Sequence, residues 1–249
     1  MQSYNWSLFK KRSYSPYSGR TNVCMIAGES GKYYPGVRLE NISFPLSIDP
    51  IQTAIFSCLS EADKPKTLLA PPDSSGQAEK ETEEDLKNWR HLFDLEIQLV
   101  DDHELPDPSL LFATAEDAQT SQSRLSELTK QCIIPFSGFP VTALLKTDKG
   151  VYSGVNIELS EWQKGLCAER VAISKAVASG AGILEYIHVY APQSDYVSPC
   201  GACRQVISEQ MEQGVVMLQH NETESSRFHI SDLLPYQFRA GNLNMNKDQ

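Results

Sequence analysis

The feature that most constrains this chain is an internal repeat. The segment PYSG at residues 16–19 recurs as PFSG at residues 135–138, an offset of 119 residues. A second segment, YPGVRLE at 34–40, recurs as YSGVNIE at 152–158, at an offset of 118 residues. Two matches in nearly the same register predict that the 249 residues form two copies of one domain. A length of this size accommodates two small domains.

Each copy repeats the same alternation of strands and a helix. Strand pairs joined at a glycine turn precede a helix with an apolar stripe, and a buried strand follows. In the first copy we expect strands at 23–27, 33–39 and 67–70 and a helix at 51–59. In the second copy we expect strands at 141–146, 151–157 and 187–191 and a helix at 168–178. Strands that alternate with helices favour layered α/β domains. We expect two α/β/α domains, each a mixed sheet of about five strands flanked by helices.

The segment between the copies is polar and acidic. Residues 71–85 (PPDSSGQAEKETEED) are expected to form an exposed loop that leads into a helix at 86–93. A strand at 96–100, a linker at 101–108 and a helix at 121–132 complete the pattern. The boundary is expected between 105 and 120, which gives domains at 1–110 and 111–249.

The charge and hydropathy of the chain restrict the kinds of partner that it is expected to bind. Asp and Glu number 32 against 22 Lys and Arg, and the net charge of −10 opposes binding to a phosphate backbone or an anionic membrane. No apolar run approaches the ~20 residues of a membrane-spanning helix, and the N-terminus does not have the pattern of a secretory signal. We therefore expect a small-molecule partner, no nucleic acid, no membrane and a cytoplasmic location.

Three of the six cysteines have the spacing of a metal site. Cys167 precedes the second-copy helix, and Cys200 and Cys203 form a C-x-x-C. Three thiolates with one open position are typical of a catalytic zinc site, whereas a structural site closes with a fourth protein ligand. A structural zinc with a further ligand such as His188, or simply buried thiols, is the alternative. Helix N-termini at Cys167 and Cys200 would stabilise the thiolates.

Two charged residues follow Cys167 in the first turn of its helix. Zn²⁺ with three thiolates carries a net charge of about −1, which makes bound water a weaker acid than in a three-histidine site. Arg170 and the two helix N-termini are predicted to offset that charge from the second coordination shell, although Arg170 on its own could be an ordinary surface cation. Glu169 places a carboxylate beside the metal, where it can transfer protons.

With these motifs in order, the second copy resembles the nucleoside cytidine deaminases. The resemblance spans roughly residues 121–238, and its motifs are PFS at 135–137 followed by Phe139 and Val141, NIE at 156–158, CAER at 167–170, PCGACRQ at 199–205 and LLP at 233–235. It implies a zinc enzyme in which Cys167, Cys200 and Cys203 hold the metal. Glu169 is then the proton shuttle, the catalytic residue described for zinc deaminases as a non-ligand.

The resemblance also implies substrate-binding residues. Asn156 and Glu158 match residues that bind the ribose 3′-hydroxyl. Phe139 matches an aromatic side chain that packs on the base, and the Ala168 backbone matches a group that contacts the pyrimidine edge. Phe238 matches a ring that can enter a neighbouring subunit's site, although its altered neighbours favour a packing role.

The first copy resembles the same domain without its chemistry. Residues 49–52 (DPIQ) stand where CAER stands at 167–170, so Ile51 replaces the proton shuttle. Arg38 replaces the counterpart of Asn156, and no C-x-x-C follows. We expect a degenerate first copy without a zinc site.

The function predicted is hydrolytic deamination of cytidine or 2′-deoxycytidine to the uridine nucleoside and ammonia, by hydroxide bound to zinc, in pyrimidine salvage. A deaminase of a cytosine-nucleoside antibiotic and a non-catalytic, zinc-stabilised regulatory homologue remain alternatives. Editing of DNA or RNA is a third, disfavoured by the negative charge. By analogy with the four-domain assemblies of the family, two chains are expected to form a homodimer.

Overall fold

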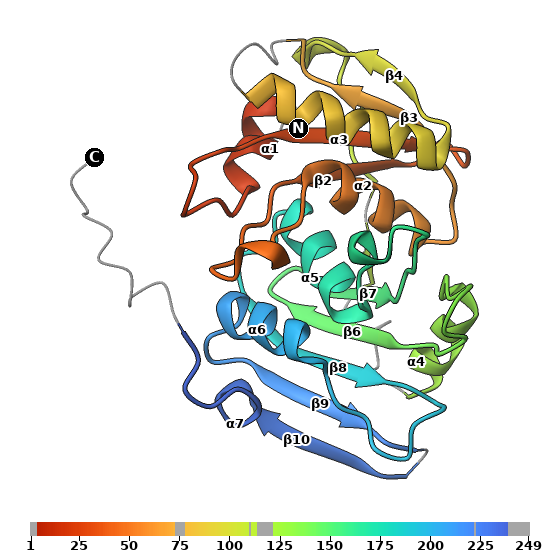
Figure 1. Ribbon diagram of the computed structural model, residues 1–249, viewed down its shortest axis with the longest axis vertical. Helices are drawn as coiled ribbons and strands as arrows, with labels where there is room; N and C mark the ends of the chain where they lie inside the picture. Colours follow the sequence, from red (N-terminus) through yellow and green to blue (C-terminus); the bar gives the residue numbers. More distant parts are fainter. Residues whose placement is uncertain (1–3, 73–77, 110, 114–121, 222, 239–249) are drawn as a thin grey trace, which may run out of the picture.

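The computed structural model describes residues 4–72, 78–109, 111–113, 122–221 and 223–238. Two sheets lie at opposite ends of the molecule, and helices α2 (Pro50–Leu59) and α5 (Ala168–Ala178) lie between them (Figure 1). One sheet has four strands in the order β2-β1-β3-β4, and the other has six in the order β10-β9-β8-β6-β7-β5. The fold class predicted from the repeat is confirmed, with four and six strands in place of about five each.

The first copy contributes a sheet and three helices within the described residues. Its elements are α1 (Trp6–Arg12), β1 (Val23–Gly28), β2 (Tyr33–Val37), α2, β3 (Pro65–Ala70), α3 (Ala78–Phe93) and β4 (Glu96–Leu99). The pairs β1–β2 and β1–β3 are antiparallel, and β3–β4 is parallel.

The second copy repeats that order and extends it at both edges of the sheet. Its elements are β5 (Phe112–Ala113), α4 (Gln122–Leu128), β6 (Thr142–Thr147), β7 (Val151–Val155), α5, β8 (Leu184–Tyr190), α6 (Gly201–Gln210), β9 (Val215–Gln219), β10 (Ser225–His229) and α7 (Ile230–Leu233). Here β6 pairs antiparallel with β7 and β8, and β8 pairs parallel with β9. The two sheets therefore share one topology, as two copies of one domain should.

The match between the copies extends to single residues. Leu39 bridges Tyr14 and Ile48 in the first copy, and Ile157 bridges Ile133 and Leu166 in the second. Glycine seats the helix in both: a Cβ on Gly36 would lie 2.1 Å from the Pro50 carbonyl oxygen, and a Cβ on Gly154 would lie 2.1 Å from that of Ala168. Only glycine lets the second strand approach the helix start so closely.

One expectation about the segment between the copies is wrong. We expected an exposed loop as far as residue 85, but α3 already begins at Ala78. The run AEKETEED consists mainly of residues with good helix propensity, and this local preference outweighs the acidic charge. Helices α1 and α7 and strands β5, β9 and β10 were not predicted. Residues 73–77 of the same segment lie outside the described residues.

The copies join through a pseudo-symmetric interface around α2 and α5. The Arg170 guanidinium donates to the Leu46 carbonyl oxygen at 2.9 Å, and the Gln52 amide donates to the Lys164 carbonyl oxygen at 2.7 Å. The two donor residues are 118 positions apart in the sequence, and so are the two acceptor residues, which is the offset of the repeat. This arrangement is that of an isologous dimer contact, here made within one chain.

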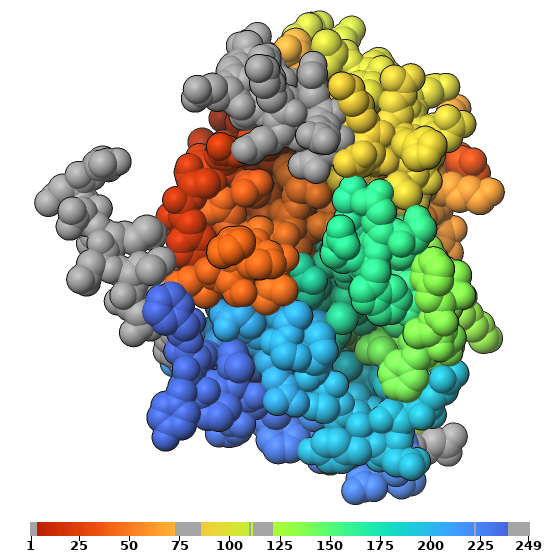
Figure 2. All heavy atoms as spheres, in the orientation of Figure 1, coloured from red at the N-terminus to blue at the C-terminus, as the bar shows by residue number. Residues whose placement is uncertain are grey.

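Further contacts across the interface involve charged side chains. The fully buried Lys175 ammonium pairs with Glu61 at 2.6 Å. At the end of α6, the Glu209 carboxylate accepts from the Tyr17 hydroxyl at 2.7 Å and from the Ile42 amide at 2.8 Å. Figure 2 shows the first copy (red to orange) lying directly against α6 (light blue). Buried apolar side chains of both copies belong to one cluster, so the halves share a core.

No helix in the described ranges is both long enough and apolar enough to span a bilayer.

Candidate active site

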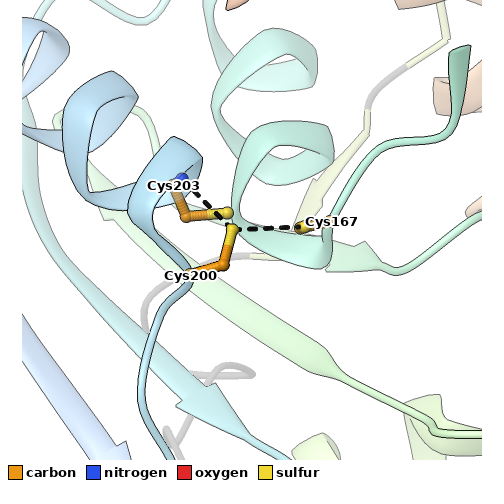
Figure 3. A group of neighbouring side chains, drawn as sticks. All are labelled: Cys167, Cys200 and Cys203. Atoms are coloured by element: carbon orange, nitrogen blue, oxygen red, sulfur yellow. Dashed lines mark hydrogen bonds between the residues drawn. The ribbon is translucent and has the colours of Figure 1, made fainter. Parts of the chain in front are cut away.

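Three sulfur atoms from two helix starts converge in the second copy. Cys167 is the N-cap of α5, Cys200 is the N-cap of α6, and Cys203 lies in the first turn of α6. The Cys167 and Cys200 Sγ atoms are 3.8 Å apart, and the Cys203 amide donates to Cys200 Sγ at 3.4 Å (Figure 3). All three sulfurs lie within 4.8 Å of one another. The structure thus brings together the three predicted ligands.

The sulfur cluster has the dimensions of a zinc site. Tetrahedral Zn–S bonds of about 2.3 Å hold sulfurs about 3.8 Å apart. Among the described residues, no fourth His, Cys, Asp or Glu joins the group. His188, the candidate fourth ligand of a structural site, instead contacts the Gln219 side chain at 3.1 Å. The donor set therefore fits a divalent cation with one position left for a small ligand.

Hydrogen bonds among the cysteines shift the pKa values of their thiols in opposite directions. Those with Cys167 and Cys203 lower the pKa of the Cys200 thiol, and the hydrogen bond with Cys200 raises the pKa of Cys167. A bound divalent cation would favour the thiolate form of all three, because the thiolate is the metal ligand. The exposed Cys200 faces solvent, while Cys203 is buried.

Glu169 lies beside this cluster in the first turn of α5. Its side chain is 2% exposed, and its Oε2 atom has no hydrogen-bond partner among the described residues. Burial raises the pKa of this carboxyl to about 7. A buried carboxylate oxygen without a partner is costly unless a ligand completes it. The orphaned oxygen is a second observation, besides the sulfur geometry, that fits a metal with a bound water.

The predicted substrate-binding residues lie around one loop, residues 135–141. The Asn156 amide accepts from the Val141 N–H at 2.9 Å and donates to the Phe139 carbonyl at 2.8 Å. One Glu158 oxygen accepts from the Phe136 and Ser137 N–H groups, at 3.0 and 3.1 Å. Asn156 therefore shapes the loop that presents the Phe139 ring, which is 36% exposed.

The remaining predicted residues differ in their surroundings. Ala168 is buried at the start of α5, between Cys167 and Glu169. Arg170 follows in the same turn, and its described hydrogen bond reaches the Leu46 carbonyl of the first copy. Phe238 is 54% exposed at the end of the described residues.

Sequence reasoning missed the contacts that hold the loop before Cys200. The Arg204 guanidinium donates to the Pro199 carbonyl at 2.9 Å and to the Ser198 hydroxyl at 2.6 Å, and Gln193 donates to the Gly138 carbonyl at 3.0 Å. Arg204 belongs to a motif, but nothing in its spacing identifies these acceptors. The contact between Gln193 and Gly138 depends on the tertiary fold, which brings two distant segments together.

The corresponding position in the first copy has different chemistry. Asp49 caps α2: its side chain accepts a hydrogen bond from the Gln52 backbone N–H at 2.8 Å. Cys167 is the N-cap residue at the same place in α5. Arg38 pairs with Glu40 at 2.8 Å, and Glu40 is 3% exposed. Within the described part of the first copy, no trio of ligand groups gathers at this position; the second candidate group, Asp101, His103 and Glu104, lies exposed beyond β4.

Comparison with known proteins places both halves in one family. Two models described as the cytidine and deoxycytidylate deaminase zinc-binding region match, at residues 115–219 and at residues 8–68. The cytidine deaminase of Sporosarcina psychrophila is 38% identical over 122 residues, 48% of this chain and 90% of that protein. That of Mycoplasma genitalium is 35% identical over 118 residues, 47% of this chain and 91% of that protein.

Among solved structures, cytidine deaminase from Burkholderia pseudomallei is 30% identical and covers 49% of this chain and 98% of its own, with a TM-score of 0.46. The fold and the sulfur cluster are those of a protein with two α/β domains and a candidate zinc site in the second. The chain belongs to the cytidine deaminase family, in a form with two deaminase domains. Zinc is the metal of the matching region.

Proposed function

We propose that this chain hydrolyses cytidine, 2′-deoxycytidine or both to the uridine nucleoside and ammonia, as a step of pyrimidine salvage. The observation that carries the proposal is the convergence of Cys167, Cys200 and Cys203 beside the buried Glu169 carboxylate, whose Oε2 atom has no hydrogen-bond partner among the described residues. Family membership supports deamination of cytidine.

In this proposal the three cysteine sulfurs hold Zn²⁺ and leave one position open. When bound, the ion lowers the pKa of a water molecule and so supplies a nucleophile at neutral pH. The N–H groups at the starts of α5 and α6 stabilise the negative sulfurs. Arg170 adds a positive charge in the same turn as Glu169, and we propose that this charge offsets part of the thiolate charge from the second coordination shell.

Glu169 is the proposed proton carrier. It accepts one proton from the attacking water and delivers it to N3 of the base. It then accepts the second proton from the hydroxyl on C4 and delivers it to the departing amine as the C4–N bond breaks and the C4 carbonyl forms, so that one water is consumed and one ammonia is released. Burial keeps water away from this carboxylate and raises its pKa to about 7, which allows both uptake and release near neutral pH.

The proposed substrate contacts are made by Phe139, Asn156, Glu158 and Ala168. The Phe139 ring packs on the base, and the Ala168 backbone contacts the pyrimidine edge. Asn156 and Glu158 bind the ribose 3′-hydroxyl, Glu158 with the carboxylate oxygen that does not accept from the Phe136 and Ser137 amides.

We further propose that residues 1–110 are a degenerate domain, that residues 111–249 are the catalytic domain, and that two chains form a homodimer. The homodimer is supported by Phe44 and Trp162, which occupy equivalent positions in the two copies and are 84% and 64% exposed. The six free cysteines support a reducing, cytoplasmic location.

The Glu169→Gln variant tests the proposal. We expect it to retain stoichiometric zinc by elemental analysis and to lose about 10²–10⁴ in kcat, because the amide cannot carry the proton. A panel of cytidine, 2′-deoxycytidine and base-modified cytosine nucleosides, followed by ultraviolet absorbance, identifies the substrate. Full uridine formation by Glu169→Gln would refute the proton-transfer role, and zinc-loaded wild-type protein inactive on the whole panel would favour the regulatory homologue.

A further inference from the structure

The loop between β8 and α6, residues 191–199, ends at the proposed ligand Cys200. Arg204 holds its last residues from within α6, as described above. A second anchor comes from outside the cysteine motif: His220, which follows β9 and is 6% exposed. It has no role in the function proposed so far.

The contacts of His220 determine its protonation. Its Nδ1 atom accepts from the Val197 N–H at 3.1 Å, and its Nε2 atom lies 2.8 Å from the Ser226 hydroxyl on β10. The Tyr196 ring stacks on the imidazole with centroids 5.0 Å apart and planes at 14°. Because a backbone N–H can only donate, Nδ1 must be unprotonated and the proton must be on Nε2.

The Val197 N–H depends on this acceptor. Val197 is 2% exposed, so without Nδ1 its amide would be a buried donor that water reaches poorly. Val197 stands three residues before Cys200, and Gln193 at the other end of the loop donates to the Gly138 carbonyl, next to Phe139. One loop therefore connects His220 to a sulfur of the zinc site and to the predicted aromatic platform of the base.

We propose that His220 is a positioning residue, which in its neutral form with the proton on Nε2 holds the 191–199 loop so that Cys200 keeps its place in the zinc site. The inference rests on the proposed function for the identity of the metal. It assigns to this side chain the retention of zinc rather than a contact with substrate.

The experiment measures the rate at which the zinc-loaded protein releases zinc to an excess of chelator. Asparagine places an oxygen near the position of Nδ1, whereas glutamine reaches only as far as Nε2, so the two variants separate the two contacts. We expect His220→Gln to release zinc about tenfold faster than wild type, as one buried hydrogen bond warrants, and His220→Asn to stay within about threefold. His91→Gln, on the exposed face of α3, is the matched control and should equal wild type.

Rescue by asparagine separates positioning from a general loss of stability, because only asparagine restores an acceptor for the Val197 N–H. Equal rates for Gln, Asn and wild type, or equal impairment of both variants, would overturn the inference. Wild-type protein that binds zinc but does not deaminate cytidine would refute the proposed function and leave this test intact, whereas protein that binds no zinc would refute both.

Discussion

The starts of α2 and α5 occupy the same place in the two copies and have opposite chemical character. Both helices are capped by the residue at the same repeat position, both are seated by a glycine on the second strand, and both donate a side-chain hydrogen bond across the interface. Of these two helices, only α5 has a thiol at its N-cap, and only in α5 does a carboxylate stand two residues after the cap. The comparison teaches that the start of this helix can be held without a thiol: in the first copy, Asp49 and Gln52 maintain the helix and the interface with ordinary hydrogen bonds.

The largest expected effect separates the two caps. Cys167→Ser should reduce zinc from one equivalent per chain to nearly none and lower deamination by about 10³-fold or more, because the site loses a thiolate. Asp49→Ala should leave zinc and activity unchanged and lower the free energy of unfolding by about 1 kcal/mol, the usual value of an N-cap. Elemental analysis and denaturant unfolding measure both. Two equivalents of zinc in wild-type protein would break the comparison.

The next effect concerns the glutamate after the second strand in the second copy. Glu158→Gln should raise KM for cytidine about tenfold or more with little change in stability, because a charged acceptor for the ribose hydroxyl is lost. Steady-state kinetics on cytidine and on a substrate lacking the 3′-hydroxyl check this. If the variant loses equal affinity for both substrates, Glu158 does not contact that hydroxyl.

Its counterpart Glu40 should instead affect stability. Burial alone would raise the pKa of Glu40, but hydrogen bonds from Ser18 and Arg38 outweigh burial and lower it. A lowered pKa in the folded state gives a contribution that is present above about pH 4.5 and lost as the pH falls through the folded value. Glu40→Gln should cost about 1–3 kcal/mol at neutral pH and less in acid, with KM unchanged. Urea unfolding at pH 7 and pH 3.5 measures it; an equal cost at both values would contradict the assignment.

The smallest effect lies at the pseudo-symmetric contacts. Gln52→Ala removes one hydrogen bond to the Lys164 carbonyl and should lower the free energy of unfolding by about 0.5–1.5 kcal/mol without changing zinc content. Arg170→Gln places at position 170 the residue type that the first copy has at the equivalent position, Gln52. If Arg170 offsets thiolate charge, this variant should also shift the acid limb of the pH–rate profile, while Gln52→Ala should not.

Much of this architecture could be predicted from sequence, because the repeat indicated the same three strands and one helix in each copy. The register of Leu39 and Ile157 follows from the duplicated motifs, and the C-x-x-C with its distant cysteine predicted a cluster before any distance was known. The helix start at Ala78 was missed because residues 78–85 are mostly charged and have no apolar stripe. Hydrophobic periodicity therefore could not indicate a helix there. Contacts such as those of Gln193, His220 and Glu209 join segments far apart in sequence, and no local pattern specifies them.

The pairing of Arg170 with Leu46 and of Gln52 with Lys164 has a consequence for how the molecule can change. In an assembly of identical subunits, a substitution at such a contact is made on both sides at once. Here each side is encoded separately, so one can vary while the other stays fixed. Dilution also cannot separate the partners, since the peptide chain keeps them at a high effective concentration at any protein level.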